Sequence, residues 1–337
     1  MTALPATLEG EPVPTVGAVA DLSVELRPYI VETPTLERSD FAGVVDTPVN
    51  FKFELLQVSG TFKARGAFSN MLALDAAQRQ AGVTCISAGN HAVAVAYAAM
   101  KLSIPAKVVM IKTASPARLK LCRDCGAQIV LAEDGAQGFD LVRGIEREEG
   151  RFFVHPFNGY RTILGTATLG AEWARQTPSL EAVILPIGGG GLAAGVSTAL
   201  RLALPSCQIF GVEPEGADAM RRSFEAGHPI KMGPMRGIAD SLMAPHTEAY
   251  SYGLCKRNID DLVTVTDDAL RSAMSRLFDE LKLAPEPACA AATAALLGPL
   301  RARLRGKRVG VLLCGTNTDL PTLARHIEAA PHAHASG

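Results

Sequence analysis

Short apolar runs alternate along the chain with longer, Ala-rich segments whose apolar residues recur every three or four positions. The short runs predict strands and the longer ones predict amphipathic helices, because the two structures repeat their side-chain faces at different periods. We expect strands at 83–87, 106–112, 127–132, 151–156, 181–187, 207–213, 262–266 and 308–314. We expect helices at 91–102, 136–149, 162–176, 191–203, 267–282 and 288–304.

This repeated alternation of strand and helix predicts an α/β fold with open, mostly parallel twisted sheets that carry helices on both faces. In such sheets the working loops gather at the carboxyl ends of the strands. The chain shows no internal repeat and no low-complexity linker, so we expect one domain to be inserted within the other.

Length and charge narrow the class of protein. The 337 residues are enough for two domains, and 33 Lys and Arg against 34 Asp and Glu give a formal net charge of -1. Without a basic stripe interleaved with aromatic residues, we expect no nucleic-acid partner. The sequence has no apolar run of about 20 residues, so we expect no membrane span, and the first residues show no secretory signal.

The seven cysteines are an odd number spread through apolar segments, which is typical of reduced thiols in a cytoplasmic protein. Cys122 and Cys125 stand alone, without the second pair of a zinc site, so their spacing is interpreted as that of neighbours on a helix. His332 and His334 indicate a frayed terminus rather than a metal site. We expect no bound metal.

Polar or glycine-rich turns follow three of the expected strands. They contain Ser87, Gly89 and Asn90, then four glycines at 188–191, then Gly315, Thr316 and Asn317. Where such a turn opens a helix, as the first two do, free N–H groups and the positive end of the dipole can hold an anion. Glycines there let the backbone close around a phosphate.

The glycine turn alone is compatible with two interpretations. It does not match a nucleotide P-loop, but Gly189, Gly191 and Ala194 fit the dinucleotide pattern G-x-G-x-x-A. Glu213 ends the next strand about 20 residues further on, as that pattern requires. An NAD-dependent oxidoreductase is therefore one hypothesis, and tight helix packing is the other.

Lys63 favours a different cofactor. It lies in "SGTFKARG" at an apparent strand-to-helix junction, where its charge either reaches water or does chemistry. A dehydrogenase leaves Lys63, Asn90 and Cys314 without roles. Pyridoxal phosphate would use all three, as the amine that binds its aldehyde, a partner of its ring oxygen and a partner of its ring nitrogen.

Six motifs in order, "SGTFKARGA", "SAGNHA", "HPF", "PIGGGGLAAG", "EPA" and "CGTN", make the chain from about 20 to 325 resemble a known family. It resembles the fold-type II, tryptophan-synthase-β-like pyridoxal-phosphate enzymes, and among them the serine/threonine dehydratases. The resemblance implies a smaller domain inserted in a larger one, with the cofactor in the cleft between them, and a homo-oligomer. We expect the large domain to comprise 20–78 and 159–325 and the small domain to comprise 79–158. We expect flexible tails at 1–19 and 326–337.

The resemblance also implies roles for residues at matching positions. Lys63 would form the Schiff base and later act as a base, Phe62 would pack on one ring face, and Asn90 would bind the ring oxygen. The turn of Gly188, Gly189, Gly190 and Gly191, with Leu192, would bind the phosphate. Cys314 would lie near the ring nitrogen, where relatives usually carry Ser. The substrate-binding turn would comprise Ser87, Ala88, Gly89, Asn90 and His91, while Glu286 and Ser241 face the site without a firm role.

The implied activity is dehydration and deamination of an L-3-hydroxy amino acid, threonine or serine first, to a 2-keto acid and ammonia. Serine racemases of the family carry a second Ser that reprotonates Cα, and Ala88 stands at that position. Dehydration is therefore favoured over a serine or aspartate racemase. Gly165-Thr166-Ala167-Thr168 and Ser241 depart from the dehydratase pattern, which leaves hydroxyaspartate or an aryl serine such as phenylserine as alternative substrates.

Four further residues are expected to be structural. Glu213 is expected at the surface, and Ala219 replaces an acidic ligand of the cation site found in some relatives. His91 and His155 are expected to be structural histidines, and Arg65 to form a local ion pair or helix cap.

Overall fold

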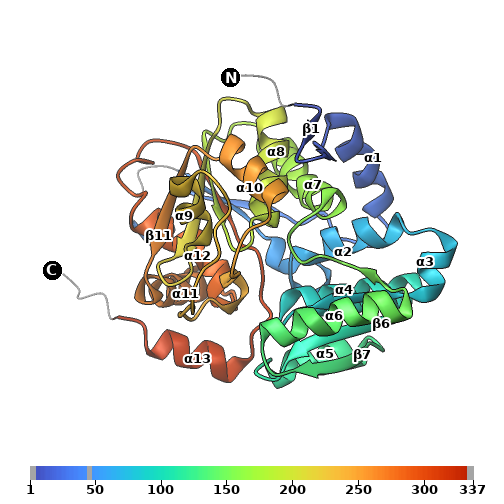
Figure 1. Cartoon of the computed structure of the whole chain (residues 1–337). Coiled ribbons are helices and arrows are strands. Elements are labelled where there is room, and N and C mark those ends of the chain that lie inside the picture. Colours follow the sequence, from blue (N-terminus) through green and yellow to red (C-terminus); the bar gives the residue numbers. More distant parts are fainter. Residues whose placement is uncertain (1–4, 44–47, 332–337) are drawn as a thin grey trace.

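The computed structural model describes residues 5–43 and 48–331, which form an α/β fold with two main sheets (Figure 1). In the described residues, the larger sheet has six strands in the order β11-β10-β9-β12-β4-β3. All neighbours in it are parallel except β3, which is antiparallel to β4 at one edge. Its strands are β3 (Thr35–Arg38), β4 (Val49–Lys52), β9 (Ala182–Pro186), β10 (Gln208–Pro214), β11 (Asp261–Val265) and β12 (Val309–Leu312).

The second sheet has four parallel strands in the order β7-β6-β5-β8. These strands are β5 (Val83–Ile86), β6 (Ala106–Ile111), β7 (Gln128–Ala132) and β8 (Phe152–Phe153). They follow one another along the chain, whereas the strands of the larger sheet come from before and after them. The predicted fold class is therefore confirmed, and the predicted domain boundaries stay a prediction.

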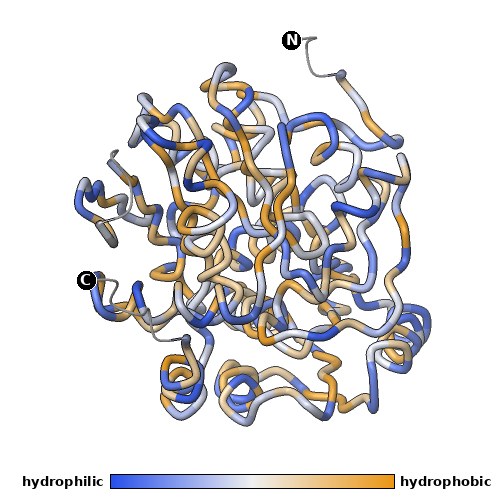
Figure 2. Tube along the Cα trace, turned by 90° about the vertical axis from the view of Figure 1, so that its left-hand side faces the viewer, coloured by the Kyte–Doolittle hydropathy of each residue, from blue (hydrophilic) through white to orange (hydrophobic). Residues whose placement is uncertain are grey.

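Helices cover both sheets, and Figure 1 shows α4, α5 and α6 around the smaller sheet. Across the described residues the helices are α1 (Val16–Leu26), α2 (Lys63–Leu72), α3 (Ala76–Ala81), α4 (Asn90–Leu102), α5 (Pro116–Asp124), α6 (Gly135–Glu149), α7 (Tyr160–Gln176), α8 (Gly191–Ala203), α9 (Ala219–Ala226), α10 (Ala249–Asn258), α11 (Asp267–Leu281), α12 (Pro287–Leu297) and α13 (Leu320–Glu328). Helices at the periphery carry both hydrophilic and hydrophobic residues in Figure 2, as expected for elements with one buried face.

Local sequence explains where several helices begin. The side chains of Ser115, Asp134 and Thr266 accept hydrogen bonds from backbone N–H groups in the first turns of α5, α6 and α11. The helix expected at 288–304 is shorter than predicted, because α12 ends at Leu297 and Gly298 follows it as the cap. Turns occupy most of the remaining stretch.

The helices α2, α7 and α8 pack closely because small residues lie between them. A Cβ atom on Gly165 would lie 2.6 Å from the Arg65 carbonyl oxygen of α2, and one on Gly170 would lie 2.6 Å from the Val196 carbonyl oxygen of α8. This close packing holds α2, which begins with Lys63, against α7, and the buried residues of α2 share a core cluster with residues of α4.

The structure corrects part of the predicted N-terminal tail. Residues expected to be flexible contain a two-stranded hairpin, β1 (Thr7–Leu8) with β2 (Glu11–Pro12), and the first turn of α1. Tyr250 fixes this hairpin by donating a hydrogen bond to the Pro12 carbonyl. The predictions for His332 and His334 fall outside the described residues. Part of the predicted C-terminal tail lies in α13.

Other findings concern the described residues as a whole. No helix among them has both the length and the apolarity that a membrane crossing requires. No cluster of three metal-ligating side chains occurs in the same part of the chain. All seven cysteines are unpaired thiols, and Cys122 and Cys125 lie on and just after α5.

Candidate active site

Lys63 begins α2 and points toward the junction of the two sheets. The turn before it is tight, with left-handed backbone at Ser59 (φ 62°) and Gly60 (φ 69°). Thr61 bridges Gly315, and the Phe62 amide donates to the Cys314 carbonyl at 3.2 Å, so the turn is tied to the end of β12. Lys63 therefore lies close to Phe62 and Cys314, two other residues that the sequence predicts for the site.

The Lys63 amine lies in a restricted environment. Its Nζ donates a hydrogen bond to the Pro156 carbonyl and lies 5.1 Å from the centroid of the Phe62 ring. Burial lowers the pKa of this amine to about 8, against the opposing effects of Cys314 and Glu286. Near physiological pH a larger fraction of this amine than of an exposed lysine amine is therefore neutral, as a nucleophile or base requires.

The four glycines form a tight turn between β9 and α8. Gly190 has a left-handed backbone (φ 97°), which favours glycine. A Cβ atom on Gly191 would lie 2.6 Å from the Phe157 carbonyl oxygen, and one on Gly188 would lie 3.0 Å from Leu242 Cα. The turn must therefore lack side chains, and it leaves backbone N–H groups at the start of α8 for an anion.

The glycine turn and Lys63 line the same cavity. The other predicted residues on its wall are Phe62, Asn90, Leu192, Ser241, Glu286 and Cys314. They come from segments that follow β5, β9 and β12, from the starts of α2 and α12, and from the 240–242 turn, and so belong to both sheets. The structure thus brings together all the residues predicted for cofactor binding.

The Asn90 side chain is held at both ends. Its Nδ2 donates to Glu286 Oε1 at 2.6 Å and to Ser241 Oγ at 3.2 Å. Its Oδ1 accepts from Asn317 Nδ2 at 2.7 Å, and the same Nδ2 donates to the Ser59 carbonyl at 2.9 Å. The orientation of the amide is therefore set by its neighbours rather than free to rotate.

The predicted substrate turn lies directly before α4. The Gly89 amide donates to Ser87 Oγ at 3.0 Å, and Ser87 and Ala88 are both half-buried. Asn90 reaches the wall of the main cavity, whereas Ser87, Ala88 and Gly89 are not among its lining residues. The first N–H groups of α4 are nevertheless close to it, because Asn90 begins this helix.

The two histidines of the region are neutral, His91 being buried and His155 half-buried. The Nε2 of His91 donates to the Val154 carbonyl at 2.8 Å, and His155 Nδ1 accepts from the Phe157 and Asn158 amides at 3.3 and 3.0 Å. Burial, and next the nearby Lys63 charge, lower the pKa of each imidazole to about 3. Both therefore have the structural contacts expected from the sequence.

Cys314 is buried at the end of the β12 segment, next to Cys289 of α12. A hydrogen bond with Cys289 and burial both raise the pKa of the Cys314 thiol well above its ordinary value. The thiol therefore stays protonated and uncharged, so it cannot act as a carboxylate would toward a ring nitrogen.

Glu213 was predicted at the surface, and that prediction is wrong. Its side chain is fully buried, and its two oxygens accept the Met220 and Arg221 amides at 2.8 and 2.7 Å. Glu213 thus caps α9 across the loop that follows β10. With both oxygens engaged, it is not placed to bind a ribose, which removes the main support for the NAD hypothesis.

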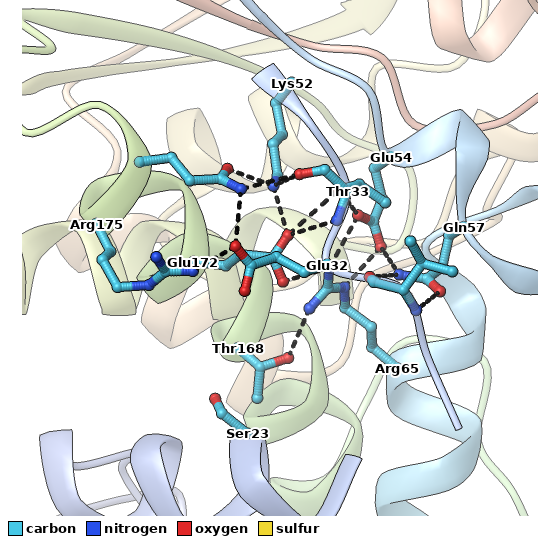
Figure 3. A network of polar contacts seen from close by, with 12 residues as sticks. Ser23, Glu32, Thr33, Lys52, Glu54, Gln57, Arg65, Thr168, Glu172 and Arg175 are labelled. Atoms are coloured by element: carbon cyan, nitrogen blue, oxygen red, sulfur yellow. Dashed lines mark hydrogen bonds and ion pairs between the residues drawn. The ribbon is translucent and has the colours of Figure 1, made fainter. Parts of the chain in front are cut away.

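Arg65 forms the expected local ion pairs (Figure 3). Its Nε and Nη2 donate to the two Glu54 oxygens at 2.6 and 3.0 Å, and Nη2 also donates to Glu172 at 2.9 Å. Lys52 joins the same cluster, with Nζ 2.5 Å from Glu172. Because both cations are fully committed to buried carboxylates, Arg65 is not available to hold a substrate.

Three residues beside the cavity were not singled out from the sequence for a role. They are Arg118, Asp240 and Asn317, which contact one another and the Asn90–Glu286 pair. Asn317 is the last residue of the motif "CGTN", and Asp240 directly precedes the predicted site residue Ser241. The sequence therefore marked the neighbourhood of both residues. No local pattern marks Arg118.

These residues fit a cofactor that combines an aldehyde with a phosphate. A partly buried amine of lowered pKa faces the cavity, and a cradle without side chains lies on the same wall. The cavity also has a fixed amide at Asn90 and a neutral thiol at Cys314. Pyridoxal phosphate needs each of these features.

Comparison with known proteins agrees with this fit. A family model described as "Pyridoxal-phosphate dependent enzyme" matches residues 26–315. The chain is 69% identical to the phenylserine dehydratase of Ralstonia pickettii, over 95% of this chain and 98% of that protein. It is 34% identical to the L-threo-3-hydroxyaspartate ammonia-lyase of Saccharomyces cerevisiae, over 93% and 96%. The structure of maize serine racemase superposes with a TM-score of 0.89 at 31% identity, covering 94% and 97%.

The family and cofactor predicted from the sequence are thereby confirmed, and the NAD-dependent alternative is not supported. The chain belongs to the family of pyridoxal-phosphate-dependent enzymes, takes pyridoxal 5'-phosphate as its cofactor, and is an ammonia-lyase that acts by β-elimination on a 3-hydroxy amino acid.

Proposed function

We propose that the substrate is phenylserine, which loses ammonia overall to give phenylpyruvate as the 2-keto acid. The observation that carries this proposal is the 69% identity to a phenylserine dehydratase over nearly the whole of both chains. Threonine or serine, named first from the sequence, is less well supported than this alternative, because the threonine and serine enzymes compared are far less similar.

The cavity supports an aryl substrate over hydroxyaspartate. Phe62, Phe157 and Leu242 contribute apolar surface to its wall, which suits a phenyl ring. Among the described residues that line it, Lys63 is the one cation. Arg118 nearby is paired with Asp240 and Glu286. The second carboxylate of hydroxyaspartate would therefore lack a free positive partner.

Residues on the wall of the cavity would hold the cofactor. Gly188–Gly191 and the Leu192 amide would bind its phosphate, and Phe62 would pack against its ring. Asn90 would donate to the ring oxygen with the Nδ2 hydrogen that otherwise meets Ser241 Oγ, while the other hydrogen stays on Glu286. When bound covalently, the cofactor withdraws electrons from the substrate Cα and so makes its proton acidic. Cys314 supplies a neutral partner at the ring nitrogen, which favours elimination over transamination.

The chain's own groups then divide the remaining work. Ser87 and the first N–H groups of α4 would bind the substrate carboxylate at the positive end of that helix. The Lys63 Nζ would accept the Cα proton as a general base, and its lowered pKa suits that task. Ala88 offers no proton to Cα, so loss of the Cβ hydroxyl is favoured over return of a proton.

A substrate panel tests the proposal. Purified, cofactor-loaded protein would be given phenylserine, threonine, serine and hydroxyaspartate, and the release of keto acid and ammonia and the exchange of enantiomers would be measured. We expect phenylserine to have the highest kcat/KM. Faster turnover of threonine, serine or hydroxyaspartate would replace the proposed substrate, and exchange without keto acid would replace the proposed reaction.

A further inference from the structure

One guanidinium group, that of Arg118, joins three loops beside the cavity. Arg118 lies in the first turn of α5, and its side chain is buried. Its Nη1 lies 2.5 Å from Asp240 Oδ2, and its Nη2 lies 3.6 Å from Glu286 Oε2. Its Nε donates to the Asn317 carbonyl at 3.2 Å. Arg118 follows a strand of the smaller sheet, whereas its three partners lie among the elements of the larger one.

Two of these partners hold Asn90. Glu286 Oε1 accepts from Asn90 Nδ2 at 2.6 Å, and Asn317 Nδ2 donates to Asn90 Oδ1 at 2.7 Å. A flipped amide would place donor against donor at Asn317 and acceptor against carboxylate at Glu286. The direction of the Asn90 side chain therefore depends on Glu286 acting as an acceptor and on the position of Asn317.

Glu286 in turn depends on Arg118. Its Oε2 is buried and has no hydrogen-bond partner in the described part of the chain, so the guanidinium at 3.6 Å is its compensating charge. The other charged or titratable groups that act on Glu286 are Asp240 of the 240–242 turn, Lys63 of α2 and Cys314 after β12. Burial raises the pKa of Glu286 to about 7, and Arg118 opposes that rise.

The guanidinium also lies directly against the substrate turn. A Cβ atom on Gly89 would be 3.0 Å from Arg118 Nη1 and 3.2 Å from its Cζ. Any larger residue at 89 would press on the guanidinium, so the glycine and the arginine are matched to each other. Arg118 thus contacts both the backbone that precedes Asn90 and the groups that orient its side chain.

We propose that Arg118 is a positioning residue of the active site. Its guanidinium opposes protonation of Glu286 and holds that carboxylate in place, so that Glu286 and Asn317 together aim the Asn90 amide into the cavity. This inference rests on the proposed role of Asn90 at the cofactor. It differs from a purely structural bridge between the two sheets, which would contribute stability without controlling Asn90.

Two substitutions separate these roles. Arg118→Met removes the cation and leaves Glu286 buried without a counter-charge. Arg118→Met combined with Glu286→Gln removes the need for that charge, because a neutral amide oxygen can still accept from Asn90. For each variant we would measure the dissociation constant of pyridoxal phosphate and the absorption maximum of the bound cofactor against pH.

We expect Arg118→Met to weaken cofactor binding by about ten-fold or more and to shift the absorption maximum, since it strands a buried charge. The double variant should recover most of the affinity and of the spectrum. Arg123→Met, on the exposed face of the same helix, is the matched control and should change neither.

Two results would overturn the inference. One is an Arg118→Met protein that melts earlier but binds the cofactor with normal affinity and spectrum, and the other is failure of Glu286→Gln to restore either. If Arg118→Met does not fold, Arg118→Gln with and without Glu286→Gln gives the same comparison, because Gln is also uncharged, and equal affinities would reject the inference. A wild-type protein that binds the cofactor but leaves phenylserine intact would reject the proposed substrate alone, because these measurements need no turnover.

Discussion

The Lys63 amine donates a hydrogen bond to the carbonyl of Pro156, a residue 93 positions further along the chain. Pro156 is held in turn by His155, whose Nδ1 accepts the amides of Phe157 and Asn158. Phe157 packs against the glycine turn, where its carbonyl oxygen leaves no room for a side chain at Gly191. One short loop therefore ties the amine to the phosphate cradle.

This arrangement predicts that Lys63→Ala abolishes the visible absorbance of the bound cofactor, because no other amine lines the described cavity. Turnover of the 3-hydroxy amino acid should fall by at least about a thousand-fold, since both the covalent anchor and the general base are removed. Absorption spectroscopy and a keto-acid assay measure the two effects. Lys120→Ala, at an exposed lysine of α5, is the control. A yellow, active Lys63→Ala protein would contradict the assignment.

The lowered pKa of Lys63 predicts how the apoprotein takes up its cofactor. Only the neutral amine attacks an aldehyde, and burial lowers the pKa from 10.5 to about 8. The rate of uptake should therefore rise with pH up to about 8 and level off above it. Stopped-flow absorbance measures this rate.

Pyridoxal phosphate also has titratable groups, so the measured pH dependence of uptake must be corrected for them with a reference reaction. Its reaction with free Nα-acetyllysine at each pH supplies the correction, because that amine is exposed to water. A corrected midpoint near the ordinary lysine value would show that the folded protein does not perturb Lys63.

The elements predicted correctly from sequence are those with a local pattern. All eight expected strands occur, since each contains a short, mostly apolar run, although the strand expected at 151–156 is reduced to the two residues of β8. Strand β4 was missed because it contains Lys52, whose charge is compatible with burial only through Glu172 and the Thr33 carbonyl. The residues predicted for the cofactor came instead from the resemblance to known enzymes, and each stands at the end of a strand or the start of a helix.

Contacts between distant segments could not be predicted in this way. Glu213 looked like a surface residue because the α9 amides that it accepts become neighbours only in the fold. Arg118 meets Asp240 across 122 positions, and neither residue belongs to a periodic pattern that would mark the pair. What the sequence lacks is therefore the long-range pairing of polar groups.

The glycine turn predicts a steric test of the phosphate cradle. In Gly191→Ala the new Cβ would lie 2.6 Å from the Phe157 carbonyl oxygen, so the backbone at the start of α8 must shift. We expect the affinity for pyridoxal phosphate to fall by about ten-fold or more, because the phosphate-binding N–H groups move with it. Titration of the apoprotein measures the loss.

Gly135→Ala is the matched control for this substitution. Gly135 is also the first residue of a helix, α6, and a Cβ there meets nothing within 4 Å. It should leave cofactor affinity unchanged. Equal affinities in the two variants would mean that the glycine turn does not hold the phosphate.

The buried network of Figure 3 predicts a large stability effect. Arg65→Met leaves Glu54 and Glu172 without their shared cation, and Glu54 is completely buried. We expect the free energy of unfolding to fall by about 3–5 kcal/mol, measured by denaturant titration. Arg143→Met, which breaks an exposed pair with Glu146, should cost about 0.5 kcal/mol or less. Similar losses in both variants would show that the network adds no more than a surface pair.

Ala88 predicts a change in the fate of the Cα proton. It lies in the turn between Ser87 and Gly89, at the position where serine racemases of the family carry their second Ser. Ala88→Ser would add a hydroxyl that can return a proton to Cα, so inversion at Cα, which converts phenylserine into its diastereomer, should become measurable while keto-acid release continues. Chiral chromatography of residual substrate in deuterated water measures that inversion. Ala88→Val, which adds similar bulk without a proton, should show none, and inversion in both variants or in neither would locate the control of racemisation at another residue.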